Sequence, residues 1–304
     1  MHERYIEQVR LLMRALPSIA EEKVFALKGG SAINLFYRDM PRLSVDIDLV
    51  YLPVEDRETS LRNIDEALDR IVGTLARRSP DMRLQRIAGG GNNETRIMIG
   101  SGRAQVKVET SPVGRGIVLA PQSLRVADVV KDTFGFAEMQ VVAFEDLYGG
   151  KLHAALDRQH PRDFYDVKLL YENEGLTDSL FRVFLVYVSA SGRPMHELLA
   201  PAKASLDALY TEEFAGMTRD VVSLDELESA RARLLDDIRT RLTGDAATFL
   251  LSLHDAEPDF GLIGLPDAER LPAAQWKLLN LRKLKADNPK KHAEQRALLK
   301  ALLG

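Results

Sequence analysis

The chain has 304 residues with 45% hydrophobic and 28% charged side chains, a net charge of −4 at pH 7 and no cysteine. This composition is typical of a soluble globular protein with one large or two modest domains, and it excludes disulfides and thiolate metal sites. No apolar run is long enough to cross a bilayer, and the segment 1–17 carries charges where a signal peptide has an apolar core. We therefore expect a cytoplasmic protein without a membrane partner.

Three helices are predicted in the first half of the chain. Apolar residues at helical spacing predict a helix over 5–16, which Pro17 ends, and a long amphipathic helix over 55–78. Between them, a Gly29–Gly30 turn leads into a helix over 32–37.

Short β-like runs are interleaved with these helices, with glycine-rich turns such as Gly89–Gly91 between some of them. The predicted strands are 24–27, 44–49, 82–87, 95–99, 104–109, 117–119 and 139–142. The part of the chain up to residue 143 is therefore predicted to be an α/β (α+β) domain.

Beyond residue 143 the pattern becomes helical. Helices are expected over 145–157 and 161–171, and everything from residue 178 onward is helical with glycine and proline interruptions. The residues 144–304 are thus predicted to form a second, mostly helical domain.

The small-residue turn and the strand after it suggest a catalytic centre. Asp46 and Asp48 alternate in an apolar strand, so both carboxylates would project from the same face. Two carboxylates side by side repel each other, and a bound metal ion usually offsets that cost. We therefore predict Asp46 and Asp48 as ligands of Mg²⁺, with Mn²⁺ as a substitute. The alternative is an ordinary turn followed by solvated aspartates.

The turn itself is suited to holding the phosphates of a nucleoside triphosphate (NTP). Gly29, Gly30 and Ser31 open a helix, where backbone N–H groups and the helix dipole favour an anion. The Ser31 hydroxyl can also donate to a phosphate oxygen. A triphosphate pocket beside a metal-binding strand is the equipment that nucleotidyl transfer needs.

Several segments resemble the AbiEii/AbiGii nucleotidyltransferase toxin family, which includes the MenT toxins and belongs to the DNA polymerase beta-like nucleotidyltransferase superfamily. They cover nearly the whole chain and are 25–49, 107–110, 149–170, 192–201 and 275–285. One departure is the fourteen-residue interval between Ser31 and Asp46, which is long for the superfamily.

The resemblance implies a polymerase beta-like core with a mixed sheet, followed by a helical domain that completes the active site. It implies Mg²⁺-dependent transfer of a nucleoside monophosphate from an NTP to an RNA hydroxyl, with the tRNA 3′ end as the expected acceptor, which would block translation. It also implies a toxin–antitoxin or phage-defence system with a cognate antitoxin, acting by direct contact or by modifying the toxin.

A third carboxylate is expected from the strand at 104–109. Lys107 and Glu109 share a strand face, and the superfamily places a carboxylate on a neighbouring strand to line up the acceptor hydroxyl. Glu109 is therefore predicted to act as general base or second-metal ligand. An ordinary Lys107–Glu109 surface pair is the competing interpretation.

The helical half supplies the remaining predicted catalytic residues. By resemblance, Lys151 binds the triphosphate and offsets charge on the leaving pyrophosphate. Asp163 and Asp166 share a helix face, and the resemblance makes one of them catalytic or a clamp for Lys151, with Asp163 preferred. The alternatives are a solvated lysine, and acidic residues favoured by the dipole of a helix N-terminus.

Ser44 is a predicted regulatory site, because it lies two residues before Asp46. A phosphate there would add close to two negative charges beside the metal site. We expect such a modification to silence the protein.

The C-terminal segment from Trp276 carries eight basic and two acidic residues, a net charge of +6, which leaves −10 on the rest of the chain. A basic segment on an acidic body suits a polyanion, although a solvated helix face would look the same. The predicted RNA contacts are Lys277, Arg282, Lys283 and Lys285. Trp276 could stack on a base, but a tryptophan next to leucines is more often in the core.

Two other functions fit the same residues. One is transfer to a small molecule or a protein side chain. The other is a nucleotide-binding module without turnover, which the retention of several costly charges together argues against.

Overall fold

The structure is a computed structural model that describes residues 3–88 and 95–304. The predicted Gly89–Gly91 turn lies outside these residues. The chain divides into two compact units, one of Met1–Ala143 with Gly216–Val221 and one of Phe144–Ala215 with Val222–Gly304.

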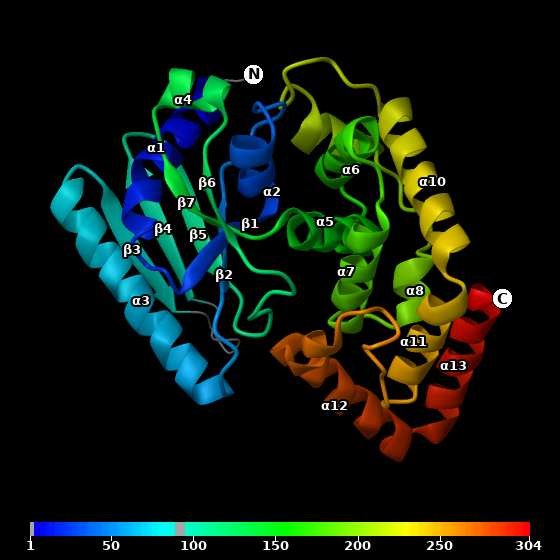
Figure 1. The fold of residues 1–304 in the computed structure, drawn as a ribbon. Helices are drawn as coiled ribbons and strands as arrows, with labels where there is room; N and C mark the ends of the chain where they lie inside the picture. Colours follow the sequence, from blue (N-terminus) through cyan, green and yellow to red (C-terminus); the bar gives the residue numbers. More distant parts are fainter. Residues whose placement is uncertain (1–2, 89–94) are drawn as a thin grey trace. The chain divides into compact units, whose positions relative to one another are not determined.

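Unit 1 is built on a mixed sheet in which the described strands follow the order β3-β4-β5-β2-β1-β7-β6 (Figure 1). The pairs β2/β5 and β1/β7 are parallel and the other pairs are antiparallel. This confirms the predicted α/β class with a mixed sheet. The strands are β1 Phe25–Lys28, β2 Ile47–Tyr51, β3 Arg83–Ala88, β4 Thr95–Ser101, β5 Ala104–Thr110, β6 Gln122–Arg125 and β7 Glu138–Val141.

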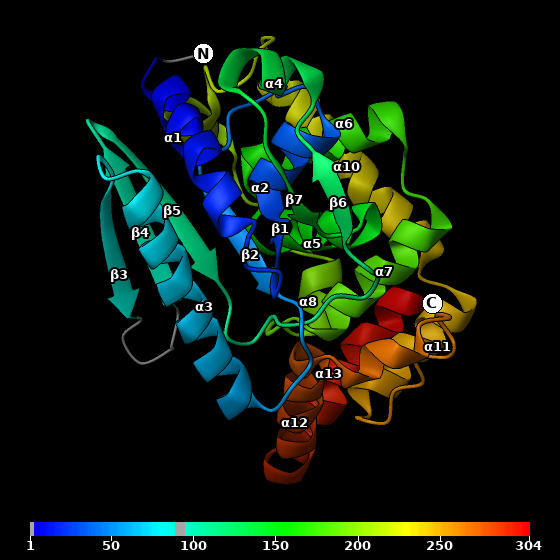
Figure 2. The same ribbon diagram turned by 60° about the vertical axis from the view of Figure 1, so that its left-hand side comes forward.

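Two long helices, α1 (Glu3–Ile19) and α3 (Arg57–Arg78), pack side by side against this sheet (Figure 2). They bury apolar side chains of the strands, among them the fully buried Leu49, Ile97 and Val108. Because successive strand residues point to opposite faces, the polar residues between these positions gather on the other face of the sheet.

The helix after β1 begins earlier than predicted. Gly29 and Gly30 lie in the first turn of α2 (Gly29–Ala32), which continues directly into the π-helical turn η1 (Ile33–Tyr37). Asp46 lies one residue before β2, so only Asp48 of the predicted pair belongs to the strand.

Three further predictions in unit 1 need correction. The segment 117–119 is irregular instead of a strand, whereas β6 and the helix α4 (Asp128–Phe134) were not predicted. Pro17 lies inside α1, which extends to Ile19. The helix continues because proline removes only its own N–H, and the N–H of Ala20 still donates to the Leu16 carbonyl at 2.8 Å.

The regular elements of unit 2 are all helices in its described residues, joined by loops such as 200–206 and 255–265. Its predicted helices are confirmed as α5 (Phe144–Arg158) and α6 (Pro161–Asn173), and α6 starts at the N-cap His160, whose ring nitrogen accepts from the Arg162 N–H. α5 packs against α6 and α7, and α6 against α10. The remaining helices are α7 Asp178–Ser189, α8 Met195–Leu199, α9 Asp207–Leu209, η2 Tyr210–Phe214, α10 Leu224–Arg241, α11 Gly244–His254, η3 Pro266–Arg270, α12 Pro272–Asp287 and α13 Pro289–Leu303.

Neither unit contains, in its described residues, a helix of the length and apolar character needed to span a membrane.

Candidate active site

The strand register of unit 1 aligns four charged residues across the sheet. Lys28 lies opposite Asp48, Asp48 opposite Glu109, and Glu109 opposite Arg96. Directly paired residues on neighbouring strands project from the same face. Asp48 and Glu109 therefore lie side by side between two cations, Lys28 and Arg96, on the face opposite the apolar one.

Glu109 is held by two cations. Its carboxylate lies 2.5 Å from the ammonium of Lys107 and 3.0 Å from the guanidinium of Arg96. Burial alone would raise the pKa of Glu109, but Lys107 and then Arg96 hold it below its usual range. A carboxylate with a lowered pKa is a weak proton acceptor at neutral pH. The ion pairs with Lys107 and Arg96 give Glu109 an electrostatic role in this row, and its role as general base or second-metal ligand stays a prediction.

Lys107 has a larger part in this site than the sequence indicated. Burial would lower the pKa of Lys107, but its hydrogen bond to Glu109 and the charges of Asp46, Glu109 and Asp48 raise it. The ammonium thus interacts with the three predicted catalytic carboxylates of unit 1. The positive charge of Lys107 therefore partly neutralises the negative charges of these carboxylates.

A metal ion would have to use Asp46 and Asp48 together with ligands from outside the chain. In residues 3–88 and 95–304, no group of three or more carboxylate, imidazole or thiol side chains is arranged to hold a metal ion. Two carboxylates still fit a hard cation such as Mg²⁺, which takes several of its oxygen ligands from phosphates and water.

The start of α2 lies directly against Asp48. Gly29 has a φ of +74°, and a Cβ atom there would lie 2.4 Å from a carboxylate oxygen of Asp48. Lys28, the N-cap, gives no side-chain hydrogen bond to the first turn. The small residues predicted to admit a phosphate therefore lie beside the predicted metal ligand.

Replacement of Gly29 by alanine tests this close approach. The variant Gly29→Ala should lose about 1–2 kcal/mol of unfolding free energy, because the backbone conformation is strained and the Asp48 carboxylate must move. The matched control is Gly102→Ala, which also has a positive φ (+56°) but meets nothing within 4 Å. Urea denaturation should show the larger loss for Gly29→Ala, and nucleotide transfer should fall only in that variant. Equal activity in both variants would contradict the prediction.

Ser31 makes a structural contact within unit 1. Its side chain is fully buried and its hydroxyl donates to the backbone carbonyl of Asp46. The Ser44 hydroxyl oxygen lies 3.2 Å from that of Ser31. Ser31 therefore fixes the loop that carries Asp46, and its contact with a phosphate stays a prediction.

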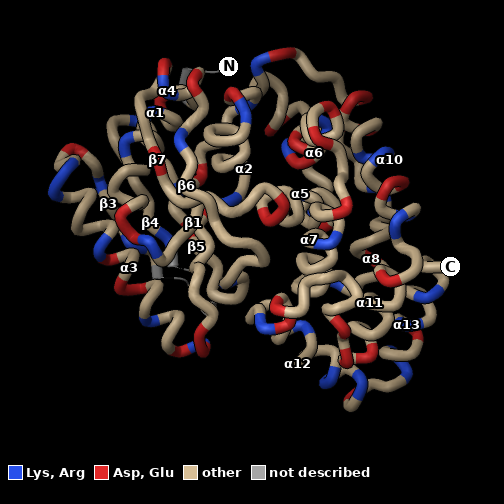
Figure 3. The backbone as a smooth tube through the Cα atoms, in the orientation of Figure 1, with Lys and Arg blue, Asp and Glu red and all other residues tan. Residues whose placement is uncertain are grey.

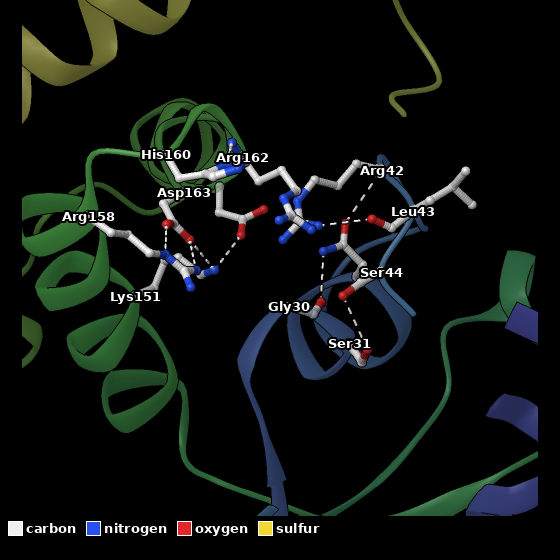
Figure 4. Close-up of polar contacts among 12 residues, drawn as sticks. Gly30, Ser31, Arg42, Leu43, Ser44, Lys151, Arg158, His160, Arg162 and Asp163 are labelled. Atoms are coloured by element: carbon white, nitrogen blue, oxygen red, sulfur yellow. Dashed lines mark hydrogen bonds and ion pairs between the residues drawn. The ribbon is translucent and has the colours of Figure 1, made fainter. Parts of the chain in front are cut away.

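A second link joins this loop to the helix. The fully buried Asn34 donates from its amide to the Gly30 carbonyl at 2.8 Å and accepts from the Arg42 N–H at 3.3 Å. Arg42 is also buried and donates to the Leu43 carbonyl at 3.0 Å (Figure 4). Sequence reasoning missed both residues, since nothing in their spacing marks them.

In unit 2, Lys151 lies between the two predicted acidic residues. Its ammonium is 2.9 Å from a carboxylate oxygen of Asp163 and 2.9 Å from one of Asp166, and all three side chains are buried. Arg158 binds Asp163 through two hydrogen bonds of 2.5 and 2.8 Å (Figure 4). Burial would raise the pKa of Asp163, but Lys151 and Arg158 hold it far below its usual range.

These four residues form a cluster whose two positive and two negative charges balance. The structure brings together the three predicted residues and gives both acids the geometry of a clamp on Lys151. Arg158 was not predicted. Its signal was its position seven residues after Lys151, two turns along the same helix face.

The predicted RNA-binding residues do not share one surface. Arg282, Lys283 and Lys285 are exposed on α12, where basic residues gather toward the helix end (Figure 3). Lys277 is buried and donates to the Arg193 carbonyl at 2.6 Å, so its prediction as an exposed contact is wrong. Trp276 is 55% exposed and is therefore not the core residue of the alternative interpretation.

Comparison with known proteins identifies a matching family and a similar solved structure. The family model described as "Nucleotidyl transferase AbiEii toxin, Type IV TA system" matches residues 10–279. Among solved structures, MenT4, a nucleotidyltransferase toxin from Mycobacterium tuberculosis H37Rv, is similar with a TM-score of 0.56 and 15% sequence identity. That likeness covers 97% of this chain and 94% of MenT4. The search of curated proteins found no match.

Proposed function

The chain belongs to the AbiEii family of nucleotidyltransferase toxins of type IV toxin–antitoxin systems, and we propose that it transfers a nucleoside monophosphate from an NTP to the 3′ end of a tRNA. The new bond joins the α-phosphorus to the acceptor oxygen. The bond from that phosphorus to the oxygen bridging the β-phosphate breaks, pyrophosphate leaves with the electron pair, and the proton of the acceptor hydroxyl passes to water. A blocked 3′ end cannot be aminoacylated, so translation stops.

The observation that carries this proposal is the position of Asp48 between Lys28 and Glu109, with Gly29 against its carboxylate. Asp46 and Asp48 would hold Mg²⁺ or Mn²⁺, which when bound neutralises the triphosphate and polarises the acceptor hydroxyl. The backbone N–H groups at Gly29 and Gly30 orient the phosphates.

Unit 2 contributes Lys151 to the same reaction in this proposal. Its ammonium offsets charge that develops on the leaving pyrophosphate, and Asp163 and Asp166 orient it. The support is the resemblance of segment 149–170 to the family together with the buried cluster that these residues form.

The three exposed basic residues of α12 are proposed to contact RNA phosphates. Three such contacts should weaken binding roughly 20-fold between 50 and 200 mM salt. The triple variant Arg282→Ala/Lys283→Ala/Lys285→Ala should bind more weakly and lose most of this salt dependence. Filter binding of labelled tRNA over a salt series measures both, and an unchanged slope in the variant would exclude α12 as the contact.

The test of the function is a labelling experiment. The protein is incubated with total RNA, Mg²⁺ and each of the four α-labelled NTPs in turn, with the variant Asp46→Ala/Asp48→Ala as control. Label at RNA 3′ ends in the native protein alone supports the proposal. Label only on protein or on a small molecule means the same chemistry on another acceptor. No pyrophosphate release with Mg²⁺ or Mn²⁺ means a nucleotide-binding module without turnover.

Membership of the family implies an antitoxin partner, and we propose Ser44 as a position at which modification would silence the toxin. The variant Ser44→Glu should lose at least tenfold in transfer activity, because a negative charge enters two residues from Asp46 and disturbs the contact with Ser31. Ser44→Ala should retain more activity than Ser44→Glu. Equal activity in the two variants, measured by label transfer at matched folding, would rule the charge mechanism out.

A further inference from the structure

Unit 2 contains a buried lysine without a carboxylate partner. Lys277 on α12 is 7% exposed, and in the described part of the chain its only acceptor is the Arg193 carbonyl, 2.6 Å from its ammonium. An ammonium group has three N–H donors, so one carbonyl leaves two of them unmatched. Burial lowers the pKa of Lys277 to about 8, because the charged form loses water.

Such an arrangement costs stability. A buried charge that lacks an opposite charge is unfavourable, and an apolar side chain of similar length would remove that cost. Uncompensated buried charges of this kind are found preferentially where they meet a ligand.

Lys277 lines a cavity within unit 2 that has a volume of about 150 Å³. The cavity is formed by α8, the end of α11, α12 and α13 with the loop before α8, which lie together in Figure 1. Lys291 and His196 add nitrogen donors to its wall, and none of the described residues that line it is acidic. The charge of the wall therefore suits an anion.

The rest of the wall is apolar, apart from a few amide and hydroxyl groups. Leu281, Leu284 and Leu299 line the cavity, and Trp276 also lines it with 55% of its surface exposed. An aromatic side chain half exposed beside an anion site offers a stacking surface for a planar ring.

We propose that this cavity binds a nucleotide, with the phosphate against Lys277 and the base against Trp276. A cavity of about 150 Å³ has room for several water molecules, and so for a phosphate and part of a sugar. The base therefore lies at the rim, where Trp276 is. The nucleotide is either free or the end of an RNA strand. The inference concerns unit 2 alone and holds whether or not the chain transfers nucleotides.

Trp276 is the single tryptophan of the chain, so its fluorescence reports on this site alone. The full-length protein is titrated in chelator, without Mg²⁺, with AMP, adenosine, inorganic phosphate and a single-stranded RNA trinucleotide. We expect a saturable change with AMP or with the trinucleotide, and much weaker changes with adenosine or phosphate alone. A response to AMP identifies a free nucleotide as sufficient, and a response only to the trinucleotide identifies an RNA end.

The variant Lys277→Met should weaken this binding at least tenfold, and Lys300→Met, the same change at an exposed position of α13 outside the cavity wall, should not. Asp46→Ala/Asp48→Ala should retain the response, which separates this site from the transfer site. No saturable response to any nucleotide, equal losses in both lysine variants, or loss in the aspartate variant would overturn the proposal.

A second measurement does not depend on the folding of Lys277→Met. Native protein is acetylated at pH 8 with and without the ligand, and the modified peptides are quantified by mass spectrometry. The ligand should protect Lys277 and leave the exposed Lys300 unaffected. Unchanged acetylation of Lys277 at a saturating ligand concentration would exclude its contact with the phosphate.

Discussion

The variant Asp48→Asn should lose at least about 10³-fold in kcat/KM for nucleotide transfer, which corresponds to about 4 kcal/mol of transition-state stabilisation. Asparagine keeps the shape of the side chain that lies against Gly29, but it removes the charge that a divalent cation requires. Unfolding free energy should change by less than about 1 kcal/mol, because the packing is retained. Steady-state kinetics with the labelled NTP and urea denaturation measure the two quantities separately.

Two other variants define what this loss means. Asp69→Asn, at an exposed position of α3, should keep full activity. Glu109→Gln should lose less than Asp48→Asn, since Lys107 and Arg96 already neutralise the Glu109 carboxylate. A loss as large as that of Asp48→Asn would make Glu109 a metal ligand, and full activity in Asp48→Asn would disprove the proposed site.

Most helices and strands of unit 1 could be predicted from the sequence because their apolar residues repeat at the spacing of a helix or of a strand. α3 shows apolar residues at helical spacing, and β5 alternates buried and more exposed residues along its length. β6 has no such pattern, since Gln122–Arg125 is an edge strand with mostly exposed side chains. The strand expected at 117–119 failed because three apolar residues in a row do not specify a strand partner.

The sequence predicted residues of the candidate site only where the residue types and their spacing within one short segment both indicate the function. Asp46 and Asp48 are marked by their alternation, and Gly29 by the turn before them. The row that joins Asp48 to Arg96 depends on strand register, which a single sequence does not state. The burial of Lys277 likewise depends on how α12 packs. The sequence alone therefore did not distinguish the buried Lys277 from the exposed basic residues of the same helix.

The variant Asp163→Asn should destabilise unit 2 by about 3–5 kcal/mol at pH 7, because it removes the charge that pairs with the buried Lys151 and with Arg158. The matched control is Asp157→Asn, which breaks an exposed pair with Arg193 and should cost less than about 1 kcal/mol. Urea denaturation followed by circular dichroism gives both values. Similar small losses in the two variants would mean that the cluster does not stabilise the fold.

The pH dependence gives this prediction an independent check. Lys151 and Arg158 lower the pKa of Asp163 in the folded state, so its contribution to stability is complete above the carboxyl pKa of the unfolded chain, about 4. As the pH falls below that value, the unfolded chain takes up a proton at this position before the folded one does, and the contribution shrinks. The difference in unfolding free energy between the native protein and Asp163→Asn should therefore stay constant from pH 7 to about 5 and narrow below about 4. A difference that stays the same down to pH 3 would mean that lost packing, and not lost charge, destabilises the variant.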